Sequence, residues 1–221
     1  MVGTSRLIEN NRSPISIADI DALDINMVNR FDRSTAMRFS DSSASASDVF
    51  RDAIWAAPFA LALSKQGREN GLSIALMYAQ VFSLNGGVTL FVKSAVGRFR
   101  PFAYNPEGPI LEKLEDNTRR SFFSGHTSHV ASLSFFTATV FSDLYPNSKF
   151  KALVWGAAIA APAVTAYLRV SAGRHFPTDV IAGYGVGALI GHLIPRLNRL
   201  SNNSSIDIIG GSDSVGIIYT L

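Results

Sequence analysis

The stretch RVSAGRHFPTD (residues 169–179) places an arginine, a histidine and an aspartate at the spacing RxxxxxHxxxD. Pro177 follows His175 by two positions, and proline favours the first turn of a helix. Asp179 then falls in that first turn, where its carboxylate can reach back to one imidazole nitrogen of His175 and hold its tautomer. The stretch therefore predicts a loop that presents an oriented histidine and leads directly into a helix.

Two other short stretches carry side chains of matching chemistry. KSAVGRFRP (93–101) holds Lys93, Arg100 and Pro101. Arginine can grip two phosphate oxygens with its planar fork, whereas lysine acts as a point charge. Together with Arg169 these residues supply three positive groups, which suit a phosphoryl group carrying close to two negative charges.

The third stretch, SGH (124–126), precedes a long apolar run. Serine is a preferred helix N-cap, so we expect a helix to begin just after Ser124. The first amides of a helix point outward with partial positive charge and bind phosphate oxygens. Gly125 lets a ligand come close to the backbone, and His126 brings a second imidazole to the same place.

The three motifs, KxxxxxxRP, SGH and RxxxxxHxxxD, resemble the signature of the type 2 phosphatidic acid phosphatase superfamily. That superfamily includes membrane lipid phosphatases, soluble class A acid phosphatases and vanadium haloperoxidases. The resemblance covers about residues 93–190. Two positions depart from the usual pattern: Phe123 stands where proline usually opens the second motif, and Leu168 stands where serine usually precedes the arginine. Neither position supplies a reacting group, so the departures bear on substrate preference and local geometry.

The resemblance also implies a role for each motif residue. His175 is the nucleophile that forms a phosphohistidine, His126 is the general acid and then the general base, and Asp179 supports His175. The expected phosphate-binding residues are Lys93, Arg100, Ser124, Gly125 and Arg169. No metal and no other cofactor is expected, because fixed cations and amides would stabilise the charge. We leave Arg98, Arg119, Arg120 and Arg174 as accessory or solvated.

Composition favours a membrane protein of the all-α class. Of the 221 residues only 17% are charged and 47% are apolar, and there is no cysteine. Five stretches approach the length of about 20 residues that crosses a bilayer: 48–64, 71–93, 126–145, 152–170 and 178–195. The glycine series Gly183, Gly187 and Gly191 predicts close helix packing. A soluble bundle of fully buried apolar helices is the alternative, and the mean hydropathy of only +0.19 is compatible with it.

Alternating helix direction predicts where the motifs meet. If successive spans are antiparallel, the ends that carry Lys93, His126, Arg169 and His175 lie on one face of the bundle. We therefore expect a single site at one end of a helical bundle of about five or six core helices.

The chain divides into three expected parts. Residues 1–45 are a polar segment, in which Ile20, Leu23, Met27 and Phe31 predict a short amphipathic helix. Residues 46–200 form the phosphatase bundle. Residues 201–221 alternate in polarity around GGSDS, which suggests a hairpin.

We therefore predict a membrane-associated phosphatase that hydrolyses lipid phosphate or diphosphate monoesters. Its partners are a lipid phosphate and the membrane, and the net charge of +3 gives no basis for nucleic-acid binding. Family resemblance places it in a bacterial-type cell membrane as a multi-pass protein with the active site facing the periplasm. The alternatives are a soluble periplasmic acid phosphatase, a vanadium haloperoxidase and a non-catalytic membrane protein of the same fold.

Overall fold

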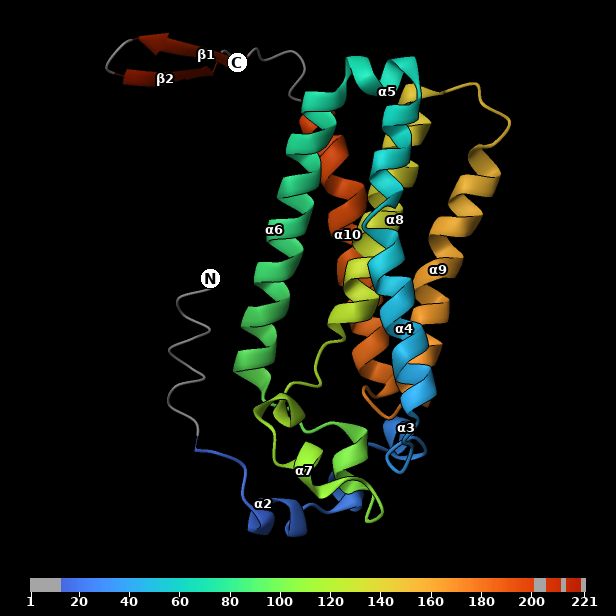
Figure 1. The fold of residues 1–221 in the computed structure, drawn as a ribbon, viewed down its shortest axis with the longest axis vertical. Coiled ribbons are helices and arrows are strands. Elements are labelled where there is room, and N and C mark those ends of the chain that lie inside the picture. The colour runs from blue at the N-terminus through green and yellow to red at the C-terminus, as the bar shows by residue number, and fades with distance from the viewer. Residues whose placement is uncertain (1–12, 201–205, 212–213, 220–221) are drawn as a thin grey trace.

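The computed structural model describes residues 13–200, 206–211 and 214–219 (Figure 1). Long helices run side by side along the long axis, most of the short elements gather at one end, and the short helix Lys65–Glu69 lies at the other. The helices in chain order are α2 (Ile17–Asp21), the 3-10 helix η1 (Ile25–Met27), α3 (Arg30–Arg33), α4 (Asp41–Ile54), η2 (Ala57–Leu63), α5 (Lys65–Glu69), α6 (Gly71–Val96), η3 (Pro101–Tyr104), α7 (Ile110–Lys113), η4 (Asp116–Arg119), α8 (Gly125–Leu144), α9 (Lys151–Ser171) and α10 (Pro177–Leu200).

Helix α8 is the centre of the bundle. It packs against α10, α9, α6 and α4 (Figure 1). The apolar core around it includes Leu133, Phe136 and Val140, which meet Val81 of α6. Because other helices cover α8, it can carry many serine and threonine side chains that a lipid-facing helix would expose.

The closest helix contact is between α8 and α10, and the glycine series makes it possible. A Cβ on Gly183, Gly187 or Gly191 would lie 2.5, 2.2 and 2.1 Å from the backbone carbonyl oxygens of three α8 serines. Those distances are far shorter than van der Waals contact, so only glycine fits at the present spacing. The close packing predicted from the GxxxGxxxG series is therefore present.

Within the part of the chain that the structure describes, three helical segments have the length and apolar character of membrane spans: Gly71–Tyr104, Lys151–Ser171 and Pro177–Asn198. Their outer faces are largely uncovered by protein. Large apolar side chains there remain exposed, as on a surface that lipid covers; they include Leu72, Leu76, Leu153, Ile159, Ile181 and Leu189.

Two of the five expected spans look different in the structure. The stretch 126–145 is a continuous helix, α8, which carries many serine and threonine side chains and is largely covered by other helices rather than lipid-facing. The stretch 48–64 is not one helix, because α4 begins earlier, ends at Ile54 and gives way to η2. Pro58 lies in the first turn of η2, and proline has no amide hydrogen to continue a preceding helix.

The amino-terminal segment forms three short elements, α2, η1 and α3, instead of the single amphipathic helix predicted over residues 20–31. Ser16, Asp24 and Asn29 each accept a hydrogen bond from a backbone amide at the start of a new element. These caps divide the segment, because each one ends the preceding turn and begins another. Met27 and Phe31 are exposed as a result. Residues 1–12 lie outside the described part of the chain.

Glycine turns bring the motifs together at one end of the bundle. Gly97 ends α6 with a positive φ of 61°, four residues after Lys93. Gly173 has a φ of 67° and lies so close to the carbonyl of Arg38 that a Cβ would collide with it. It turns the chain between α9 and His175.

At the carboxyl end, β1 (Ile206–Gly211) pairs antiparallel with β2 (Ser214–Tyr219), with Ile206 opposite Tyr219. These strands fall in the stretch whose alternation suggested a hairpin. The rest of residues 201–221 lies outside the described part.

Candidate active site

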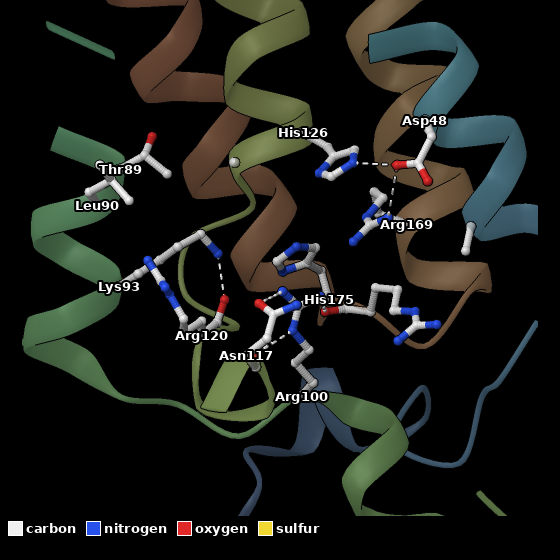
Figure 2. A pocket seen from close by; sticks show the side chains of 13 residues that line it. Asp48, Thr89, Leu90, Lys93, Arg100, Asn117, Arg120, His126, Arg169 and His175 are labelled. Carbon is white, nitrogen blue, oxygen red and sulfur yellow. Dashed lines mark hydrogen bonds and ion pairs between the residues drawn. The ribbon is translucent and has the colours of Figure 1, made fainter. Parts of the chain in front are cut away.

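A cavity of about 440 Å³ opens at the end of the bundle where the motifs meet (Figure 2). Helices α4, α6, α8 and α9 and the loops before α8 and α10 all contribute to its wall. The lining residues are Ala44, Asp48, Thr89, Leu90, Lys93, Arg100, Asn117, Arg120, Gly125, His126, Arg169, Arg174 and His175. Six of the eight predicted site residues are among them, and the other two, Ser124 and Asp179, lie immediately behind the wall.

The three predicted cations are almost completely buried. Lys93, Arg100 and Arg169 are exposed by only 9%, 6% and 5%. Buried charges are costly unless they are paired or neutralise a ligand. Each of these side chains nevertheless faces the same cavity, so the site is built to receive negative charge.

Protein groups hold these cations only in part. Lys93 Nζ donates to the carbonyl of Arg120, and Arg100 donates to the main-chain and side-chain oxygens of Asn117 at 2.9 and 2.8 Å. Arg169 Nη1 donates to Ser47 at 3.1 Å. Its Nε is buried and has no hydrogen-bond partner among the residues that the structure describes. That nitrogen is available to a ligand.

The start of α8 adds backbone amides to the wall. Ser124 is the N-cap, as predicted, and its hydroxyl accepts from the amide of Thr127. Ser124 is fully buried, so its side chain caps the helix rather than facing the cavity. Gly125 and His126 are the first helical residues, and their amides have no acceptor within the helix. A Cβ on Gly125 would lie 3.2 Å from Cγ2 of Thr89, a tight contact, and 3.6 Å from Lys93 Cε, so glycine leaves room between these side chains.

His175 and Asp179 are adjacent, but the contact is longer than the predicted hydrogen bond. Nδ1 of His175 lies 3.7 Å from Oδ2 of Asp179. That oxygen accepts instead from the hydroxyl of Ser121 and from the amide of Phe176 at 2.9 Å. Within the described residues, His175 Nδ1 has no hydrogen-bond partner. The carboxylate is thus fixed beside the imidazole at ion-pair distance.

The surroundings of His175 favour its neutral form. Burial, and then the positive charges of Lys93 and Arg100, hold the pKa of His175 well below its usual value of 6.5. A neutral imidazole has a free electron pair on one nitrogen, which a nucleophile needs. The cations that would bind a phosphate therefore also keep this histidine unprotonated.

Arg98 anchors the carboxylate behind His175. It donates to Asp179 at 2.6 Å and to Asp32 of α3 at 2.8 Å. Asp32 is fully buried and also accepts from the amide and hydroxyl of Thr178. The amino-terminal segment is therefore bonded directly to the site. The sequence predicts no specific role for Arg98 or Asp32, because neither is one of the residues that the three motif patterns specify.

The other three arginines set aside from the sequence differ in position. Arg120 and Arg174 line the cavity, and Arg174 pairs with Glu112 at 2.6 Å. Arg119 lies away from the cavity and pairs with Asp19 at 3.3 Å.

Helix α4 supplies two charged groups that sequence analysis missed. Asp48 Oδ1 lies 2.6 Å from Nε2 of His126, and Arg51 Nη1 lies 2.8 Å from the same nitrogen. Asp48 stands at the end of the stretch DSSASASD (41–48), which matches none of the three motifs. The signal in the sequence that could have indicated these residues is the spacing of Asp48 and Arg51, an acid and a base one helical turn apart. Across the described part of the chain, no three His, Asp or Glu side chains gather as a metal site would require.

Fold and site together define a helical protein with an oxyanion cavity at one end of its bundle. Residues 71–202 match the model of the PAP2 superfamily, which is more than half of the chain. The chain belongs to the PAP2 superfamily.

Two known proteins are similar to this chain. A lipid A 4'-phosphatase of Porphyromonas gingivalis is 33% identical over 110 residues, which are 48% of this chain and 43% of that protein. The match thus spans less than half the length of this relative. The crystal structure of a transmembrane PAP2-type phosphatidylglycerolphosphate phosphatase from Bacillus subtilis aligns with 90% of this chain and 94% of its own, with a TM-score of 0.57 and 19% identity. It has the same fold. Together with the three apolar helices, it supports a membrane protein.

Proposed function

We propose that this protein is a membrane phosphatase that hydrolyses a phosphate monoester or diphosphate on a lipid. One observation carries the proposal: three nearly buried basic side chains and the imidazole of His175 converge on one cavity. Such a cavity attracts a phosphate and places a nucleophile beside it.

The proposed reaction has two steps. His175 Nε2 attacks the phosphorus while the bond to the lipid oxygen breaks, and His126 gives that oxygen a proton as the electron pair leaves with it. Water then attacks the phosphohistidine, His126 takes a proton from the water, and inorganic phosphate is released. Lys93, Arg100, Arg169 and the first amides of α8 stabilise the charge in both steps, so the proposed chemistry uses no metal.

The lipid part of the proposal rests on the apolar helices and on the relatives. Residues of α4 and α6 line the cavity, at the end of a bundle whose outer face carries exposed apolar side chains. Both relatives described above carry the names of phosphatases that act on phosphorylated lipids. We propose a phosphorylated membrane lipid as substrate, with lipid A phosphate, phosphatidic acid, phosphatidylglycerol phosphate and an isoprenyl diphosphate as the candidates.

We also propose that the site faces the periplasm of a bacterial-type membrane. Basic residues lie at the end of the bundle opposite the site: Lys65 and Arg68 of α5, Lys149 and Lys151 near the start of α9, and Arg196 of α10 (Figure 1). Positive residues flanking membrane helices favour the cytoplasmic side, but the cavity end carries as many basic residues as this end. The proposed orientation therefore rests on the family resemblance, with the cavity facing outward.

The test is phosphate release by the purified protein in detergent. Phosphatidic acid, phosphatidylglycerol phosphate, an isoprenyl diphosphate and lipid A are compared with 4-nitrophenyl phosphate, a soluble aryl phosphate. We expect at least one lipid to have the highest kcat/KM. A preference for the aryl phosphate would identify a general acid phosphatase instead, and bromide oxidation with vanadate and peroxide would identify a haloperoxidase.

A further inference from the structure

Helix α4 brings a second carboxylate to the site, beside the other imidazole. Asp48 Oδ1 lies 2.6 Å from Nε2 of His126 and 4.0 Å from Nη1 of Arg169. Figure 2 shows the Asp48 carboxylate on the far side of the His126 ring from Lys93. A contact of 2.6 Å to a carboxylate is a short charge-assisted hydrogen bond.

This contact specifies which ring nitrogen can react. A carboxylate only accepts hydrogen bonds, so Asp48 can bond Nε2 only when Nε2 carries a proton. In the neutral ring the electron pair then lies on Nδ1, and in the charged ring Nδ1 holds the proton that can be given away. His126 lines the cavity, so Nδ1 is the nitrogen left for the substrate.

Arg51 opposes this arrangement at the same atom. Its Nη1 lies 2.8 Å from Nε2 of His126 and, as a guanidinium nitrogen, can only donate. Arg51 therefore favours the tautomer with the proton on Nδ1. Its Nε is bonded to Asp52 at 2.8 Å, and its Nη1 lies 3.3 Å from Asp48. The two α4 side chains thus select opposite tautomers of one ring.

We propose that Asp48 is the positioning residue of His126: it holds a proton on Nε2 and so makes Nδ1 the atom that exchanges protons with the substrate. The inference rests on the proposed function, because it assigns His126 as acid and base. It gives the site two carboxylate–imidazole pairs, one behind each histidine. The shorter contact, between Asp48 and His126, involves the histidine that moves protons. The longer contact, between Asp179 and His175, involves the nucleophile.

The first test reads the tautomer and needs no substrate. The chain has four histidines, so ¹⁵N spectra of histidine-labelled protein can be assigned by substituting each in turn. We expect the neutral form of wild-type His126 to carry its proton on Nε2, and the charged form that acts as the acid to carry a second proton on Nδ1. In Asp48→Asn, where Arg51 remains beside Nε2, we expect the proton to move toward Nδ1. A wild-type ring protonated on Nδ1 alone would overturn the proposal.

The second test reads the chemistry. An alkoxide is a poor leaving group and needs the proton of His126, whereas 4-nitrophenolate needs little help. We expect Asp48→Asn to lower kcat/KM by roughly 100-fold for a lipid phosphate and by less than about 5-fold for 4-nitrophenyl phosphate, since general acid catalysis contributes roughly 10²–10⁴-fold. Asp48→Glu keeps a carboxylate and should lose less kcat/KM on the lipid phosphate than Asp48→Asn.

Asp21→Asn is the control. It removes the same charge from an exposed residue at the end of α2. We expect its kcat/KM to stay within about twofold of wild type for both substrates. Equal losses in Asp48→Asn and Asp21→Asn, or equal losses on both substrates, would show a general charge or structural effect. A gain in activity on removing Asp48 would show that it merely occupies the anion site. Each of these results overturns the proposal.

Failure of the proposed function has a different signature. If the wild type released no phosphate from any substrate, the phosphatase assignment would fall. The ¹⁵N spectra would still decide whether Asp48 fixes the tautomer of His126.

Discussion

Arg98 Nη1 donates a hydrogen bond of 2.6 Å to Oδ1 of Asp179, and this bond links the site to the amino-terminal segment. The same guanidinium holds Asp32, which is fully buried in α3. A chain of contacts thus runs from the amino-terminal segment through Arg98 to the carboxylate beside His175. The segment before α4 is part of the framework of the site.

Removing Asp32 should destabilise the protein strongly. Asp32→Ala removes the carboxylate that now accepts hydrogen bonds from Arg98 and from the amide of Thr178. Breaking one side of a buried ion pair costs about 3–5 kcal/mol, and we expect a loss near the lower figure because Arg98 keeps Asp179. Thermal unfolding in detergent measures the effect. The exposed Asp21→Asn substitution is the control and should change stability by less than about 0.5 kcal/mol.

The same carboxylate predicts how stability depends on pH. Burial alone would raise the pKa of Asp32, but hydrogen bonds from Thr178 and Arg98 outweigh it and lower the pKa from 3.8. The unfolded chain therefore binds a proton more readily than the folded one. The stability that Asp32 contributes is fully present above about pH 4 and falls as the pH drops further. The difference in unfolding temperature between wild type and Asp32→Ala should narrow below pH 4; a constant difference would contradict this.

The contact between α8 and α10 predicts a sharp contrast between two glycines of one helix. A Cβ on Gly187 would lie 2.2 Å from the carbonyl oxygen of Ser128, whereas a Cβ on Gly185 meets nothing within 4 Å. Gly187→Ala should cost about 1–3 kcal/mol, because the helices must move apart. Gly185→Ala should be neutral or stabilising by up to about 1 kcal/mol. Similar unfolding temperatures for the two variants would show that the helices are not so closely packed.

The geometry of Arg169 predicts that lysine cannot replace it. Its Nη1 is bonded to Ser47 while its buried Nε has no partner among the described residues. A lysine offers one ammonium group and cannot serve Ser47 and a phosphate oxygen in the same way. We expect Arg169→Lys to lower kcat/KM by roughly 100-fold, in line with the loss of one charge-stabilising donor. Steady-state kinetics with the best lipid substrate measure it, and Arg119→Lys, remote from the cavity, should remain close to wild type.

The sequence predicts the fold class and most of the cavity because both depend on local patterns. Apolar runs of spanning length define α6, α9 and α10, and antiparallel order alone places Lys93, His126, Arg169 and His175 at one end. The glycine series predicts the contact of α10 with α8. These features need only the spacing of residues within one or two helices.

The sequence does not predict features that depend on contacts between distant segments. Asp48 and Asp32 gain their positions from α4 and α3, which carry no motif and join the site only in the folded chain. The caps at Asp24 and Asn29 break a helix that hydrophobic spacing alone predicts as continuous. Helix α8 lies at the centre of the bundle because other helices pack around it, and the composition of α8 alone does not predict this position.

The central claim is that His175 carries the phosphoryl group, and trapping that intermediate tests it most directly. The protein is mixed with its best lipid substrate, quenched within one turnover, and digested for mass spectrometry. The account predicts an alkali-stable, acid-labile phosphate on the peptide that contains His175. His175→Ala should lack it and lose at least about 1,000-fold in kcat, while His192→Ala, a histidine of α10 that contacts Thr139, should keep both. Phosphate release that persists in His175→Ala, or a phosphoryl group on another residue, would contradict the account.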